Sequence, residues 1–225
     1  MKTIFSSIFL LSVMVGLQAQ QISLGEISRT AKFGKLIDEQ NNGSTKIKYS
    51  DIKGIPYYYP EFINARIGDT STSAPIRYNS FLDTVEIVNN EDVYQLPKDD
   101  SNPYLTFTTT KEKLVFVKTD DLYSGYFFEL SDGKYRILKK VITKYQPAEP
   151  APNSMIAGSP ATFIPQKPLY FIRTENGFFK INKSAKELAN HFPEKAKEIT
   201  DFIDKHNIKL NKEEDLTKLG SFLNQ

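Results

Sequence analysis

The chain has 225 residues, in which 29 Lys and Arg nearly balance 27 Asp and Glu, so its formal net charge is only +2 at pH 7. It has neither a basic stripe nor an aromatic nucleic-acid motif, and we expect no nucleic-acid partner. The absence of cysteine excludes disulfides, thiolate metal sites and cysteine nucleophiles.

Residues 1–19 have the pattern of a cleaved export signal. Lys2 supplies a positive charge, residues 4–17 are mostly apolar, and Leu17-Gln18-Ala19 places a small residue where a signal peptidase cuts. The apolar run is shorter than the roughly 20 residues that span a bilayer. We therefore expect cleavage after Ala19, and the remaining chain is long enough for a domain with its own core.

Residues 20–182 predict an antiparallel β domain. Runs rich in β-branched and aromatic residues alternate with polar turns, as in strands 84–88 and 93–96 around the turn 89–91, and no helical pattern separates them. Asp132-Gly133 and Asn176-Gly177 are pairs favoured in two-residue type I′ hairpin turns. Further candidate strands are residues 20–27, 46–49, 62–67, 104–110, 113–118, 123–130, 134 to about 145, 169–173 and 178–181, while residues 30–40 are a short helix or a loop.

Residues 146–168 are expected to form a long proline-rich loop of this domain. Prolines are too frequent here for a regular sheet, so we expect a surface loop that is either packed on the domain or mobile. Because long loops often carry function, this loop is the first candidate for a partner surface. The candidate residues within it are Pro147, Pro150, Pro152, Met155 and Ile156.

Residues 183–225 predict helices packed on the β domain. Ser184 and Glu187 form a capping box that opens a helix reaching about Phe192, and Pro193 begins a second helix. Asn211 and Glu214 repeat the capping box before a third helix. The apolar face of the second helix consists of Ala196, Ile199, Phe202 and Ile203. The predicted fold class is mainly β: an antiparallel meander, as a curved sheet, an open barrel or a sandwich, followed by a small C-terminal helical segment.

No group of residues has the spacing of a catalytic or metal site. His191 and His206 lie at or near predicted helix ends, where the helix dipole stabilises a cation. Asp99-Asp100 and Asp120-Asp121 lack the alternating spacing of a calcium loop. The sequence also lacks a nucleophile elbow, a phosphate loop and a dinucleotide fingerprint. We therefore predict no catalytic, cofactor-binding or metal-binding residue and expect that the protein is not an enzyme.

Three consecutive tyrosines, Tyr57-Tyr58-Tyr59, lie between two prolines. In an extended segment their rings point to alternating faces, so one face could meet a partner, and Tyr58 is the candidate residue. The alternative is that Tyr57 and Tyr59 face the core while Tyr58 covers a sheet edge.

Residues 54–62 (GIPYYYPEF) and 75–79 (PIRYN), followed by Asp83 and Glu86, resemble a set of uncharacterised exported proteins of Bacteroidota that also share a lysine-rich helical end. The resemblance covers most of the mature chain and implies no activity. It implies an exported protein located in the periplasm or on the periplasmic face of the outer membrane.

These observations favour a non-enzymatic binding or accessory protein of the bacterial envelope. We expect its partner to be another envelope protein, with peripheral association with an outer-membrane complex as a further expectation. An alternative is a lipocalin-like carrier of a small apolar ligand, whose cavity would be lined by Phe107, Phe116 and Phe128. A third hypothesis is an enzyme acting on envelope glycans, which would need two carboxylates converging in a cleft.

Overall fold

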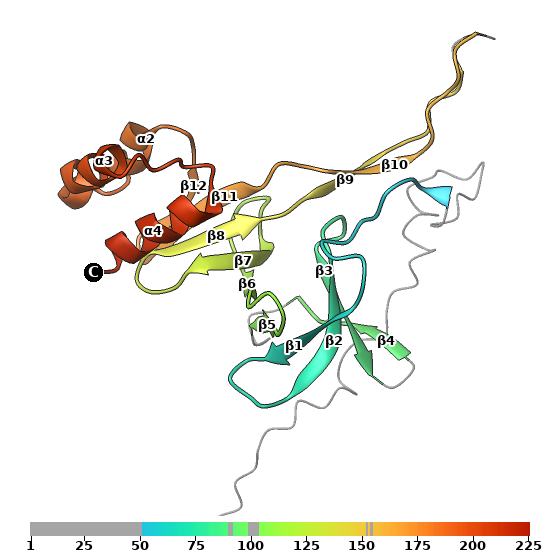
Figure 1. Cartoon of the computed structure of the whole chain (residues 1–225), viewed down its shortest axis with the longest axis horizontal. Helices are drawn as coiled ribbons and strands as arrows, with labels where there is room; N and C mark the ends of the chain where they lie inside the picture. Colours follow the sequence, from blue (N-terminus) through green and yellow to red (C-terminus); the bar gives the residue numbers. More distant parts are fainter. Residues whose placement is uncertain (1–50, 90–91, 99–103, 152, 154) are drawn as a thin grey trace, which may run out of the picture.

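The computed structural model describes residues 51–89, 92–98, 104–151, 153 and 155–225 (Figure 1). The predicted export signal, the candidate strands 20–27 and 46–49, the segment 30–40, Asp99-Asp100 and Pro152 lie outside the described residues. None of the described helices is long and apolar enough to cross a bilayer.

In the described ranges, ten strands form the main sheet, and all neighbouring strands are antiparallel. They are β1 (Ile63–Ile67), β2 (Ser73–Asn79), β3 (Thr84–Asn89), β4 (Asp92–Gln95), β5 (Leu105–Phe107), β6 (Lys113–Val117), β7 (Gly125–Ser131), β8 (Arg136–Lys140), β11 (Leu169–Thr174) and β12 (Gly177–Ile181). Their spatial order is β12-β11-β8-β7-β6-β5-β1-β2-β3-β4, so the sheet is open at β12 and β4. The predicted mainly β, antiparallel fold class is confirmed, in the form of a curved open sheet.

The sheet curls so strongly that distant strands touch through their side chains. The ring centroid of Tyr78 on β2 lies 6.1 Å from that of Tyr126 and 5.9 Å from that of Phe128, both on β7, although three strands separate β2 from β7. Ala65 and Ala74 face each other across β1 and β2, and such small side chains leave room for large rings in a close-packed core. The core of the concave face contains Ala65, Ile67, Ala74, Ile76, Tyr78, Val85, Ile87, Leu96, Leu105, Phe107, Leu114, Tyr126 and Phe128.

Helices gather at the β12 end of the sheet (Figure 1). They are α2 (Ala185–Asn190), the 3₁₀ turn η3 (Pro193–Lys195), α3 (Ala196–Lys205) and α4 (Glu213–Leu223). The Ser184 hydroxyl accepts the backbone N–H of Glu187, so the serine half of the first predicted capping box is present, whereas the Glu187 carboxylate accepts the side-chain amide of Asn182. The second predicted capping box is wrong, because α4 begins at Glu213 after Lys212, which makes no side-chain cap bond. The apolar faces of the helices share one core cluster with Ile137, Ile172 and Ile181 of the sheet.

The predicted strand from 134 to about 145 is wrong in its extent. The chain forms β8, breaks at Val141 and Ile142, and then forms β9 (Thr143–Gln146), which leaves the main sheet and pairs with β10 (Thr162–Pro165). A tertiary contact fixes this exit, because the Thr143 backbone N–H donates to the Ser80 carbonyl at 3.0 Å. The proline-rich segment 146–168 therefore contains a regular strand, contrary to the prediction.

Both predicted type I′ turns are also wrong. The β11–β12 loop consists of Glu175 and Asn176, and neither has the positive φ that a type I′ turn requires. The connection between β7 and β8 is longer than two residues and is preceded by a bulge. The Asn224 amide holds this connection by bonding both the N–H and the carbonyl of Tyr135, so tertiary contacts outweigh the local preference.

Candidate docking arm and the clusters that hold it

A two-stranded arm, described for residues 143–151, 153 and 155–166, projects from the body of the molecule (Figure 1). Beyond β9 and β10, the bridges Glu149–Ser159 and Asn153–Ile156 continue the pairing toward the tip. At the tip, Met155 is 95% exposed and Ile156 is 56% exposed. Large apolar side chains that are exposed and lie next to each other are typical of surfaces that bind another molecule.

The root of the arm is tied to the turn between β2 and β3. The hydroxyls of Ser80 and Thr143 are 2.7 Å apart and both residues are buried. The Phe81 ring contacts Tyr145 on β9 and Phe163 on β10, with centroid distances of 6.4 and 5.2 Å. Polar bonds and aromatic packing together fix the direction in which the arm leaves the body.

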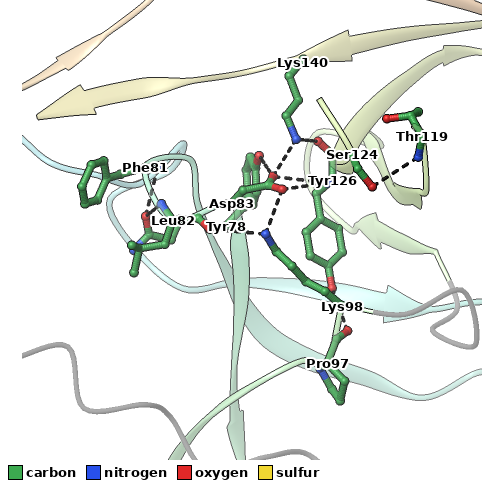
Figure 2. Close-up of polar contacts among 11 residues, drawn as sticks. Tyr78, Phe81, Leu82, Asp83, Pro97, Lys98, Thr119, Ser124, Tyr126 and Lys140 are labelled. Carbon is green, nitrogen blue, oxygen red and sulfur yellow. Dashed lines mark hydrogen bonds and ion pairs between the residues drawn. The ribbon is translucent and has the colours of Figure 1, made fainter. Parts of the chain in front are cut away.

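Asp83 lies in the same turn and is the centre of a cluster that closes the curl of the sheet (Figure 2). Its carboxylate accepts the Tyr78 hydroxyl at 2.7 Å and the Tyr126 backbone N–H at 3.2 Å. It also pairs with the ammonium groups of Lys140, at 2.9 Å, and Lys98, at 3.1 Å. The turn after β2 is thereby bound to β7 and β8, four and five strands away in the sheet order.

The cluster places a buried cation beside a constrained carboxylate. The Lys140 side chain is only 6% exposed, and burial lowers its pKa although Asp83 opposes this shift. Asp83 has a φ of +54°, an uncommon conformation for a residue other than glycine, although Asp tolerates it better than most. Gly125 permits the close approach, because a Cβ there would lie 1.7 Å from the Asp83 Oδ2.

The preceding residue, Lys139, is the centre of a second cluster on the opposite face of β8. Its side chain is 3% exposed, and its ammonium lies 2.9 Å from Glu213 Oε2 and 3.4 Å from Glu112 Oε1. It also donates to the Tyr58 hydroxyl at 3.1 Å and lies 4.8 Å from the centroid of the Phe128 ring. The cluster joins the tyrosine segment, the β5–β6 turn, β8 and the first residue of α4.

Glu112 holds the second cluster together from the solvent side. Its carboxylate accepts the hydroxyls of Tyr58 and Tyr59. Burial alone would raise the pKa of Glu112, but the bond from Tyr59 and the charge of Lys139 lower it. Burial and the nearby Glu112 raise the pKa of Tyr58, and burial together with its bond to Glu112 raises the pKa of Tyr59 to about 12.

These raised phenol pKa values predict a loss of stability in alkali. When folding raises the pKa of a phenol, the protonated phenol favours the folded state. This contribution to the free energy of unfolding is complete below the unfolded-state pKa of about 10 and is lost as the pH rises through the folded-state pKa. We expect the free energy of unfolding, measured with urea, to fall between pH 10 and about 12. The double variant Tyr58→Phe/Tyr59→Phe should show a shallower decline. Equal slopes in the two proteins would contradict the assignment.

A further polar group involves Arg77 on β2. Its guanidinium makes two bonds to the carboxylate of Glu86 on β3, at 2.8 and 3.2 Å, and Glu86 is 1% exposed. The guanidinium also lies 3.6 Å from the centroid of the Tyr57 ring and 4.3 Å from that of Phe62. The two bonds, both to Oε2 of Glu86, and the contacts with the two rings fasten the tyrosine segment to the hairpin.

The tyrosines do not alternate as expected. Tyr58 and Tyr59 both pack on the concave core, with their ring centroids 4.6 Å apart, whereas Tyr57 stacks with Arg77. The alternative arrangement is right for Tyr59, which packs on the core, and wrong for Tyr57 and Tyr58, because the segment is bent and not extended. Tyr58 is half-buried in the Lys139 cluster and is separate from the arm.

The other candidate partner residues belong to the arm. Pro147, Pro150, Met155 and Ile156 are all exposed along it or at its tip. The predictions from the sequence did not include the residues that fix the root of the arm and the curl of the sheet, above all Lys139 and Lys140. The available signal was the pair of adjacent lysines inside an otherwise apolar strand, since buried lysines need partners.

Nothing in the described part of the chain forms a group of three His, Asp or Glu side chains able to hold a metal. His191 and His206 follow the last residues of α2 and α3, as predicted. The His191 ring stacks on Phe179, and the His206 ring lies tilted against Phe202. Asp121 accepts bonds from Thr119 and Tyr123 within its own loop. These groups are occupied by local structural contacts.

No protein-family model matches the chain, and no curated protein or solved structure is significantly similar to it. Its candidate function therefore rests on the geometry of the arm and of the two lysine clusters. The resemblance to exported Bacteroidota proteins stays a prediction. The residues that carry this resemblance, Arg77 with Glu86 and Tyr78 with Asp83, are bonded to each other.

Proposed function

We propose that this protein is a non-enzymatic binding or accessory protein of the bacterial envelope, which docks on a partner protein through its β9–β10 arm. The observation that carries the proposal is the contrast between the two ends of the arm. The root is fixed by the Ser80–Thr143 bond and by aromatic packing, whereas the tip exposes Met155 and Ile156. A preorganised projecting element loses little conformational freedom when it binds.

The packing of the concave core favours this function over the carrier. Phe107 and Phe128, which would line the cavity of a carrier, stack with their ring centroids 6.2 Å apart. Phe116 packs edge-on against Tyr126 at 5.5 Å. These rings contact each other and their neighbours, and such contacts give the curled sheet a filled interior.

The proposal predicts that shortening the arm removes the partner while the body stays folded. In the test variant, residues 150–158 are replaced by Asn-Gly, so that a tight turn joins Glu149 to Ser159. These two residues already form a mutual pair of backbone bonds, at 2.9 and 3.0 Å. Both proteins, tagged at the C-terminus, are expressed from the full chain in the cells of origin and recovered from the envelope fraction.

We expect the intact arm to recover one envelope protein in stoichiometric amount and the shortened arm to lose it, as measured by quantitative mass spectrometry. Equal urea stability of the two proteins is the control for folding. Recovery of the same partner by both proteins would contradict docking through the arm. Recovery of a small apolar molecule in place of a protein would favour the carrier.

A further inference from the structure

The outer part of the arm is without charge in a chain of which 25% of the residues are charged. No Asp, Glu, Lys, Arg or His occurs from residue 150 through residue 166. Within this segment the tip presents Met155 and Ile156 to solvent. A partner surface complementary to this segment needs no charged groups, and charged groups there would lose hydration without gaining an opposite charge.

In the described part of the tip, backbone N–H groups already have hydrogen-bond acceptors within the chain. The backbone N–H groups of Met155 and Ile156 both donate to the side-chain oxygen of Asn153, at 2.9 and 3.0 Å. Glu149 and Ser159 exchange both of their backbone bonds at the base of the tip. Burying the tip therefore leaves these backbone donors satisfied, and this removes a penalty that exposed loop backbone usually incurs.

Two clefts in the described part of a second copy of this chain are a poor match for an uncharged tip. One cleft lies between the β6–β7 loop and the β11–β12 turn and is lined by Lys118, Asp120, Asp121, Arg173 and Glu175. The other lies between that turn and η3, where Tyr135, Phe192 and Pro193 line it together with the charged residues Lys134, Glu175, Glu194 and Lys195. Each cleft carries charged side chains of both signs, which the uncharged tip would desolvate without compensation.

A lipid surface fits the tip less well than a protein socket does. Interfacial anchors combine a broad apolar face with cationic and often aromatic residues. The tip has two adjacent large apolar side chains and no cation or aromatic ring between Glu149 and Ala161. Two neighbouring exposed apolar side chains at the end of an anchored arm instead have the form of a hot spot that fills a pocket.

We infer that Met155 and Ile156 insert together into an uncharged apolar socket on a partner protein. This inference rests on the proposed function and specifies the chemistry of the partner. The flexible thioether of Met155 adapts to the floor of the socket, and the β-branched Ile156 provides a stiff, shape-specific contact. Binding is therefore insensitive to salt, because screening acts on charges and not on apolar contact.

The test uses the full chain with the photo-crosslinking substitution Met155→p-benzoylphenylalanine, expressed in the cells of origin, and Lys144→p-benzoylphenylalanine as the control position near the root. We expect position 155, and not position 144, to crosslink the partner recovered in the arm-shortening experiment. Mass spectrometry should place the adduct among uncharged apolar residues of that partner. Raising the salt from about 0.1 to 1 M should change partner recovery less than about twofold.

Two substitutions of Ile156 provide a test variant and its matched control. Ile156→Asp should reduce recovery of the partner at least about tenfold, whereas Ile156→Val should retain most of it. An adduct with lipid, with a second copy or with this chain itself would overturn the inference. So would a strong loss of recovery in salt, an adduct among charged residues, or the absence of an adduct while arm-dependent recovery persists. Failure to recover any partner with the intact arm would instead overturn the proposed function.

Discussion

Replacing Asp83 by Asn should destabilise the protein by about 3 kcal/mol, because it leaves a buried cation without its carboxylate. Lys140 is 6% exposed, and its ammonium lies 2.9 Å from Asp83 Oδ1. Asn preserves the size of the side chain and tolerates the positive φ of this position. For a chain of this length, such a loss lowers Tm by about 6–12 °C. Urea unfolding and calorimetry measure the two quantities.

Lys140→Met provides the control for this prediction. Met retains the length of the lysine stem and removes the charge, so Asp83→Asn in this background should cost about 1 kcal/mol or less. The difference between the two backgrounds is the coupling energy of the pair. Identical costs in both backgrounds would show that Asp83 acts only through Tyr78, the backbone N–H of Tyr126 and Lys98.

Gly125→Ala should have an effect of similar or larger size, about 4 kcal/mol, from two sources. Gly125 has a φ of +148°, a backbone conformation that residues with a side chain rarely adopt. The new Cβ would also lie 1.7 Å from the Asp83 Oδ2 and 2.9 Å from the Lys140 ammonium nitrogen. The carboxylate must move, and the bonds that close the curl are lost with it. The free energy of unfolding in urea checks this prediction.

The two sources can be separated in an Asp83→Ala background. There the carboxylate is already absent, so Gly125→Ala should cost only the backbone strain, about 1–3 kcal/mol. If Gly125→Ala lowers the free energy of unfolding as much in this background as in the original protein, the whole effect comes from backbone strain. Because Asp83 and the arm root share the β2–β3 turn, loss of the carboxylate should also increase hydrogen exchange of Thr143, whose N–H bonds Ser80.

Local patterns in the sequence determined several of the individual elements. The strands at 84–88 and 93–96 are predicted by their β-branched residues and a polar turn, and β3 and β4 lie there. The Ser184 capping box is predicted from two residues three positions apart, and its bond from the Glu187 N–H to the Ser184 hydroxyl is present, whereas the Glu187 carboxylate bonds Asn182. Such features depend on neighbours within one turn or one hairpin, and the sequence contains all of that information. The mainly β, antiparallel class follows from the same local signals.

Only the tertiary structure decided the curl of the sheet, the course of the arm and the burial of two adjacent lysines. Lys139 and Lys140 bind carboxylates from turns and a helix that are distant in the chain, at Glu112, Glu213 and Asp83. No local spacing reports these pairs, because strand order and curvature bring the groups together. The same holds for the break before Thr143, where a bond to Ser80 directs the chain out of the sheet. The sequence thus determined which segments pair with their neighbours, whereas long-range polar contacts decided how the sheet closes and where the arm points.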